Sequence, residues 1–295
     1  MIQPQTLTIA RTIGEARTVV VRWRSQGHSV GLVPTMGWLH AGHLALVERA
    51  RAENDRVLAT LFVNPLQFGP GEDFATYPRD DARDFAVLRD HVCDAVFAPD
   101  VREMFPDSSG SLNDASTRVS VTRLANALCG ESRPGHFDGV ATIVLRLFMI
   151  AQPDAAYFGE KDYQQLTIVK RLVHDLNVPV RIAGVPIVRE ADGLALSSRN
   201  VRLDARQRAI APRLYETLGW VRDRLGAGDA APAAVAAGRE RLLAAGFDGV
   251  DYVTLAAGDT LETLVAIRPG ARLFAAALLG RTRLIDNLAV ARVTS

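Results

Sequence analysis

Residues 30–43, Val-Gly-Leu-Val-Pro-Thr-Met-Gly-Trp-Leu-His-Ala-Gly-His, decide how the chain folds. The apolar run over residues 30–33 predicts a buried strand that Pro34 ends. Gly37 allows a sharp turn without a Cβ penalty, and a helical pattern begins at Leu39. A strand, a glycine turn and a helix in this order present free backbone N–H groups and a positive dipole end to solvent. The stretch therefore predicts a site for an anion such as phosphate.

His40 and His43 lie at the start of that predicted helix. Residues three apart share a face of a helix, so both imidazoles would donate hydrogen bonds to the oxygens of one anion. The alternatives are two surface histidines or a metal pair, but no cysteine or third histidine lies nearby to complete a metal site. Because two of the six histidines fall here beside two glycines, we favour a functional pair.

The composition is that of a globular protein with an ample core: 295 residues, 48% hydrophobic, 23% charged and a formal net charge of +1. Such a balance argues against a nucleic-acid surface as a partner. The most apolar stretch, residues 141–151, is short and contains Arg146, so we expect no membrane span. Without a signal-peptide core, and with Cys93 and Cys129 far apart, we expect free buried thiols and a cytoplasmic location.

Polar side chains follow a second predicted strand, residues 57–63. Asn64 and Gln67 come next, where parallel α/β sheets bind ligands. A plain Asn-Pro turn is the simpler interpretation of Asn64. Gln67 gains interest only if its loop lies beside the histidine loop.

A second strand, turn and helix covers residues 155–173, with Gly159 at the turn. Lys161 follows it, although a cation is disfavoured in the first turn of a helix. A bound phosphate would reverse that preference, and a solvated surface lysine is the alternative. Gln165 lies one turn later on the face of Lys161 and Asp162.

The dipeptide Asp192-Gly193 between residues 185–189 and 194–196 predicts a hairpin. Ser197, Ser198 and Arg199 then offer two hydroxyls and a guanidinium to an anion, although they are also ordinary loop residues.

Further helices and strands are predicted on both sides of these motifs. Helices are expected over residues 12–26, over 80–92 with Phe85, Leu88 and Val92 inward, over 138–151, and over 204–225 and 230–245. Strands are expected over residues 95–98, 250–255, 272–278 and 283–290. The composition changes from Asp204 onward, and we predict a small α+β domain at the C-terminal end with its boundary near residues 188–200.

Taken together, five blocks resemble one known family. Residues 34–43 resemble the HxGH signature of the nucleotidylyltransferase superfamily. With that block, residues 62–79, 128–137, 158–165 and 192–200 resemble the pantothenate synthetase (pantoate–β-alanine ligase) family, in the family's order. The resemblance implies an α/β fold, with a Rossmann-like parallel-sheet domain over residues 1–187 and a smaller α+β lid domain over residues 188–295. It also implies a cytoplasmic homodimer.

The activity implied by the resemblance is a two-step ligation with ATP as substrate and Mg²⁺ as cofactor. Pantoate would attack ATP to give pantoyl adenylate, and β-alanine would then displace AMP. The catalytic residues would be His43 as proton donor, His40 and Lys161. The residues lining the ATP site would be Met36, Gly37, Trp38, Leu39, His40, Ala41, Gly42, His43, Gly159, Glu160, Lys161, Asp162, Val188, Leu196, Ser197, Ser198 and Arg199. Pantoate and β-alanine would meet Gln67, Gln165, Asn64 and Met36.

Three residues depart from the family pattern. Trp38 stands where a small residue is expected, Leu196 replaces the usual Met, and Arg146 replaces a common Lys. Two other functions compete. A nucleotidylyltransferase with a phosphorylated acceptor would share the histidine loop without needing the glutamines, and a silent nucleotide-binding protein would be expected to lack part of the His–Lys set.

Overall fold

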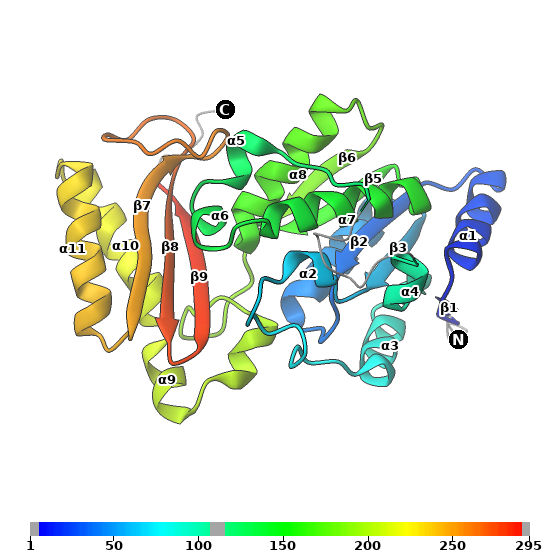
Figure 1. Cartoon of the computed structure of the whole chain (residues 1–295), viewed down its shortest axis with the longest axis horizontal. Helices are drawn as coiled ribbons and strands as arrows, with labels where there is room; N and C mark the ends of the chain where they lie inside the picture. The colour runs from blue at the N-terminus through cyan, green and yellow to red at the C-terminus, as the bar shows by residue number, and fades with distance from the viewer. Residues whose placement is uncertain (1–5, 107–115, 291–295) are drawn as a thin grey trace.

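The computed structural model describes residues 6–106 and 116–290. A six-stranded sheet lies on one side and a three-stranded sheet on the other (Figure 1). The first sheet has the order β1-β4-β3-β2-β5-β6 and its neighbouring strands are all parallel. The second is antiparallel, with the order β7-β8-β9. The predicted fold class, α/β with a smaller α+β part, is confirmed.

The larger part contains the parallel sheet and its covering helices. Its strands are β1 (Thr8–Ala10), β2 (Val30–Thr35), β3 (Arg56–Leu61), β4 (Ala95–Phe97), β5 (Ala155–Gly159) and β6 (Arg181–Val185). Its longer helices are α1 (Ile13–Ser25), α2 (Ala41–Glu53), α3 (Asp81–Asp90), α7 (His136–Ala151) and α8 (Tyr163–Asp175). Its short helices are η1 (Pro65–Gln67), α4 (Val101–Met104), α5 (Thr122–Ala125), α6 (Cys129–Ser132) and η2 (Glu160–Asp162).

Helices cover both faces of this sheet because successive strand residues point to opposite sides. Leu32 of β2 belongs to the core formed with α1, α7 and α8. The next residue, Val33, belongs to the core formed with α2 and α3. The apolar run over residues 30–33 thus contributes side chains to the cores on both faces of the sheet. The parallel sheet is therefore buried on both faces.

The smaller part packs helices on its antiparallel sheet. It contains η3 (Ser198–Arg202), α9 (Ala205–Ile210), α10 (Arg213–Gly226), α11 (Ala231–Ala244), β7 (Gly249–Ala257), β8 (Ala271–Leu279) and β9 (Thr282–Ala289). Leu218, Leu242 and Leu273 lie in its core. Phe274 of β8 instead joins the larger core, where its ring contacts the Tyr163 ring with centroids 5.9 Å apart. The division at residues 187 and 188 remains a prediction.

Two predictions about strands are wrong. Pro34 does not end β2, which continues to Thr35. It is tolerated there because β5 pairs only with Gly31 and Leu32, so the missing N–H removes no bond from that ladder. The strand predicted over residues 185–189 does not continue beyond Val185, where β6 ends, and a single antiparallel bridge joins Arg189 to Ala195.

Two predictions about helices also need correction. Val92 does not face inward, because α3 ends at Asp90 and Val92 has φ 58° and is 43% exposed. The helix expected over residues 204–225 is divided into α9 and α10 at Ala211 and Pro212, since proline has no N–H to continue a helix.

Two expectations from composition can be compared with the structure. Cys93 and Cys129 are free and buried, as predicted. Among residues 6–106 and 116–290, no helix is both long and apolar enough to cross a bilayer.

Candidate active site

The turns that follow β2, β3, β5 and β6 meet at one edge of the parallel sheet. They line a cavity of about 210 Å³, where parallel strands place their carboxyl ends together. His43 and Lys161, which are distant in sequence, both line this cavity. The other predicted site residues in its lining are Met36, His40, Gly42, Asn64, Gln67, Gly159, Asp162, Gln165, Val188, Leu196, Ser197, Ser198 and Arg199. A second cavity, about 680 Å³, shares Lys161 and Arg199 with the first and extends to β9.

Five predicted ATP-site residues lie outside the lining of the smaller cavity: Gly37, Trp38, Leu39, Ala41 and Glu160. Gly37 and Trp38 turn the chain with φ 85° and 51°. Leu39 is buried in the core, and Glu160 pairs with Arg272 at 3.5 Å. Gly37, Trp38 and Leu39 therefore place His40 rather than line the cavity.

Asp84 of α3 holds the histidine loop, and the sequence analysis missed it. Its carboxylate accepts the Trp38 N–H at 2.6 Å and the Leu39 N–H at 2.9 Å. Two of the N–H groups expected to meet an anion are therefore already satisfied. Arg83 also holds the loop, because it donates to the Leu39 carbonyl at 2.8 Å and lies over the Trp38 ring at 4.8 Å. The available signal was an acidic residue beside Phe85 on the inner face of a predicted helix.

His40 and His43 are fixed by the backbone at the start of α2. His40 is the N-cap, and its Nδ1 accepts the Gly42 N–H at 3.1 Å. The His43 Nδ1 accepts the His40 N–H at 3.4 Å, and the two ring centroids are 4.0 Å apart. Since each Nδ1 accepts, the proton of each neutral ring lies on Nε2. Each ring therefore has one N–H donor left.

Burial keeps both rings neutral. Burial and the charge of Lys161 lower the pKa of His40 to about 4. Burial, His40 and Lys161 lower the pKa of His43 well below its usual value. At neutral pH the pair therefore offers hydrogen bonds rather than protons, and an anion would meet two uncharged donors.

Lys161 lies in η2, directly after β5. Its ammonium is 3.7 Å from the Asp162 carboxylate, a loose pair that leaves it available to a ligand. The backbone of this turn is held from β9, because the Asn287 amide donates to the carbonyls of Glu160 at 2.9 Å and Lys161 at 3.0 Å. The smaller part of the protein thus fixes the turn that carries the lysine.

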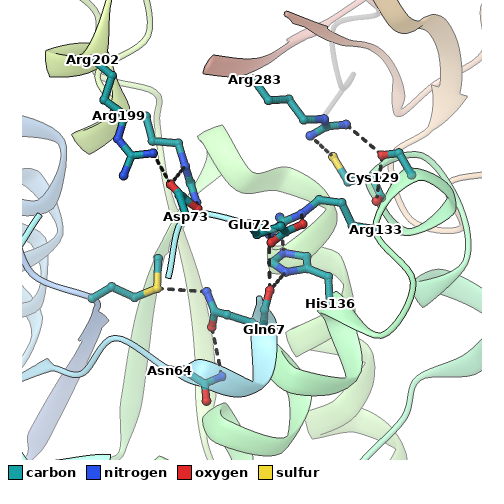
Figure 2. A network of polar contacts seen from close by, with 12 residues as sticks. Asn64, Gln67, Glu72, Asp73, Cys129, Arg133, His136, Arg199, Arg202 and Arg283 are labelled. Atoms are coloured by element: carbon teal, nitrogen blue, oxygen red, sulfur yellow. Dashed lines mark hydrogen bonds and ion pairs between the residues drawn. The ribbon is translucent and has the colours of Figure 1, made fainter. Parts of the chain in front are cut away.

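The Gln67 turn lies beside the histidine loop. This is the arrangement in which Gln67 was expected to belong to the site. The Gln67 amide donates to Met36 Sδ at 3.0 Å and accepts from Asn64 at 3.1 Å (Figure 2). Asn64 also caps η1, and it donates to the Gly139 carbonyl at 3.1 Å. A Cβ on Gly139 would lie 2.1 Å from the Leu66 carbonyl oxygen, so only glycine lets η1 approach α7 this closely.

The segment after the Asp192-Gly193 turn is tied to the loop of residues 68–79. Arg199 donates to both Asp73 oxygens at 2.9 and 3.0 Å, and Arg202 donates to one of them at 2.6 Å (Figure 2). The Ser198 and Tyr77 hydroxyls are 2.9 Å apart. Asp73 thus occupies the guanidinium that was predicted to bind an anion.

In the part of the chain that the structure describes, no three histidine, cysteine or acidic side chains gather as a metal site would require. The His40–His43 metal pair finds no support either, since both Nδ1 atoms already accept backbone N–H groups.

Comparison with known proteins agrees with this geometry. A family model described as pantoate-beta-alanine ligase matches residues 8–289. The chain belongs to this ligase family. The pantothenate synthetase of Rhodospirillum rubrum is 53% identical over 285 residues, covering 96% of this chain and 99% of that protein.

Solved structures of the same ligase family share the fold. The pantothenate synthetase of Thermus thermophilus has a TM-score of 0.89 and 50% identity, covering 96% of this chain and 99% of its own. The pantoate-beta-alanine ligase of Francisella tularensis, described as complexed with beta-gamma ATP and beta-alanine, has a TM-score of 0.80 and 33% identity, covering 96% and 97% of the two chains.

The neutral His40 predicts a loss of stability in acid. An unfolded histidine titrates near pH 6.5, so below that pH the unfolded chain takes up a proton that folded His40, with a pKa of about 4, does not. The contribution is complete above about pH 6.5 and is lost as the pH falls toward 4. We expect His40 alone to lower the free energy of unfolding by about 2 kcal/mol between pH 7.5 and pH 5.

Urea unfolding of the wild type and of His40→Gln at the two pH values measures this contribution. The variant should lose about 2 kcal/mol less than the wild type. An equal loss in both proteins would contradict a neutral His40.

Proposed function

We propose that this ligase condenses (R)-pantoate with β-alanine at the expense of ATP, through a pantoyl adenylate, and releases AMP and pyrophosphate. One observation carries the proposal: a single cavity brings His40, His43 and Lys161 together with the amides of Gln67 and Gln165. The first three suit a polyphosphate, and the amides suit a small hydroxy acid.

In the first step, a pantoate carboxylate oxygen forms a bond to the α-phosphorus of ATP, and the bond from that phosphorus to the bridging β-phosphate oxygen breaks. Negative charge grows on the phosphoryl oxygens and on the leaving pyrophosphate. Preorganised donors aimed at such charge are the largest source of rate in this class of reaction. The Nε2–H groups of His40 and His43 and the ammonium of Lys161 supply them, and His43 acts as a neutral donor.

In the second step, the β-alanine nitrogen bonds to the acyl carbon, the bond from that carbon to the AMP oxygen breaks, and the nitrogen gives up a proton to solvent water. Gln67 and Gln165 hold pantoate through both steps without reducing the nucleophilicity of its carboxylate, because an amide carries no charge. The second cavity offers a separate approach for the amine, since it meets the first at Gln165 and Lys161.

Mg²⁺ fits this site as part of the substrate. Magnesium is usually held by substrate phosphates, waters and one or two carboxylates rather than by a protein cage. The absence of a three-ligand cluster within residues 6–106 and 116–290 suits that mode. Asp162, which lines both cavities, is the carboxylate that would share it. Bound Mg²⁺ would offset charge on the phosphates.

The remaining parts of the proposal are a homodimer and a cytoplasmic location. Two free buried thiols suit a reducing compartment, and the dimer rests on family membership. Sedimentation velocity tests the dimer directly.

ATP–pyrophosphate exchange tests the proposed function. The wild type should incorporate labelled pyrophosphate into ATP only when pantoate is present, and β-alanine should then yield pantothenate and AMP. Exchange without pantoate, or exchange that needs a phosphorylated acceptor, would instead support a nucleotidylyltransferase.

The Asp84 carboxylate accepts two hydrogen bonds from the histidine loop. Weakening them should reduce catalysis less than removing a catalytic side chain. In Asp84→Asn one carboxylate oxygen becomes an NH₂ group facing a backbone N–H, so the loop loses one of two strong acceptors. We expect kcat/KM for ATP in the exchange assay to fall roughly tenfold, which corresponds to about 1.4 kcal/mol. Asp81→Asn, an exposed acid on the same helix, is the matched control, and an equal loss in both variants would contradict the role of Asp84.

A further inference from the structure

The backbone of Gln67 is held by a histidine that the proposed mechanism does not use. His136 begins α7, and its Nδ1 lies 2.7 Å from the Gln67 carbonyl oxygen (Figure 2). Gln67 is the last residue of the three-residue helix η1, and its carbonyl also accepts a longer bond, at 3.4 Å, from Arg133 Nη2. Among the hydrogen bonds of the described residues, the partners of its side-chain amide are a thioether sulfur, which is a weak acceptor, and Asn64. His136 and Arg133 thus both hold the Gln67 carbonyl, and the contact with His136 is the shorter of the two.

Arg133 decides which nitrogen of His136 carries the proton. Its Nη1 lies 3.0 Å from the His136 Nε2. A guanidinium can only donate, so Nε2 accepts and the proton must lie on Nδ1, facing Gln67. Burial and the charge of Arg133 lower the pKa of His136 to about 3, which keeps one neutral tautomer in place. His136 is thus a fixed donor to the Gln67 carbonyl.

Glu72 holds the far side of Arg133. Its two oxygens accept from Arg133 Nε at 2.7 Å and Nη2 at 2.6 Å, a bidentate pair (Figure 2). Both side chains are mostly buried, with 26% and 18% exposed. The guanidinium plane is therefore fixed, and with it the direction of the bond to His136.

We infer that Glu72, Arg133 and His136 form a relay of positioning residues that orients the Gln67 amide toward the hydroxy-acid substrate. This inference rests on the proposed function. Arg133 and His136 also line both cavities, but the relay has no hydrogen bond or ion pair with His40, His43 or Lys161 among the described residues. It should therefore act on the acid and leave ATP binding alone. A small displacement of an orienting group is enough to reduce the rate.

Two substitutions of His136 separate the relay from simple packing. In His136→Leu the donor is lost, and KM for pantoate in the exchange assay should rise about tenfold while KM for ATP stays within about twofold. In His136→Asn the amide N–H stands near the former Nδ1–H, so KM for pantoate should return to within about threefold of the wild type. Equal KM values for pantoate in the two variants, or a matching rise in KM for ATP, would overturn the inference.

Glu72→Gln provides an independent test should His136→Leu fail to fold. It keeps the shape of the side chain and removes the charge that holds Arg133, without touching Gln67. KM for pantoate should rise about threefold with KM for ATP unchanged, and an unchanged KM for pantoate would overturn the relay. The wild type is assayed first. No pantoate-dependent exchange there would refute the proposed function itself, which is a different result from either outcome in the variants.

Discussion

Replacing His43 with alanine should lower the rate of pantoate-dependent ATP–pyrophosphate exchange by about a hundredfold or more while the fold is retained. The His43 Nδ1 already accepts the His40 N–H, so its Nε2–H is the group that faces the cavity. Loss of one preorganised donor to a transition state costs roughly 3 kcal/mol, which corresponds to this factor. The measurement is kcat for exchange, with circular dichroism and thermal unfolding as the check on folding.

His43→Gln is the matched control, because glutamine can present an N–H near the position of Nε2. It should retain clearly more activity than His43→Ala. If exchange were unchanged in His43→Ala, the role assigned to His43 would be wrong. If the glutamine and alanine variants were equally inactive, the ring itself, and not its N–H, would be what the reaction needs.

Replacing Lys161 with methionine should reduce kcat/KM for ATP by roughly tenfold to 150-fold, since a hydrogen bond to a charged group contributes about 1.5–3 kcal/mol. Methionine keeps most of the length and removes the ammonium. Among the ion pairs of the described residues, the Lys161 ammonium has only a loose one, with Asp162 at 3.7 Å, so little internal structure depends on its charge. Thermal stability should therefore change little while ATP use falls.

Lys170→Met is the matched control for the lysine. Lys170 is exposed on α8, the helix that follows η2, and it is the second of the chain's two lysines. Its replacement removes the same charge without touching either cavity. Equal losses of kcat/KM in the two variants would show that net charge, and not the position of Lys161, governs ATP binding.

Local patterns were enough to predict most of the architecture. Two strand-to-helix units were predicted, from the apolar run beginning at Val30 and from the glycine turns at Gly37 and Gly159. The structure contains both, as β2 with α2 and β5 with α8. Parallel pairing of β2 and β5 then brings the two turns to one edge of the sheet. Short β1 was missed, since a three-residue strand carries too little periodicity to recognise.

The parts of the site that depend on distant contacts could not be predicted. The sequence around Asp84 does not indicate that its carboxylate oxygens accept hydrogen bonds from the N–H groups of Trp38 and Leu39. Trp38, which stands where a small residue was expected, lies under Arg83 and outside the lining of the smaller cavity. His136 has its partner, Gln67, 69 residues away. Such pairings follow from topology rather than from sequence spacing.

The other departures from the family pattern are placed by the structure as well. Leu196 lines the smaller cavity, so a methionine at this position would change the lining of that cavity. Arg146 lies over the Phe105 ring at 5.2 Å, and neither residue lines either cavity.

The most direct test follows the oxygen that attacks ATP. Pantoate labelled with ¹⁸O in its carboxylate is turned over with ATP and β-alanine, and the released AMP is examined by mass spectrometry. Attack of the carboxylate on the α-phosphorus predicts one labelled oxygen in each AMP. Unlabelled AMP formed together with pantothenate would contradict the acyl-adenylate mechanism assigned to this site.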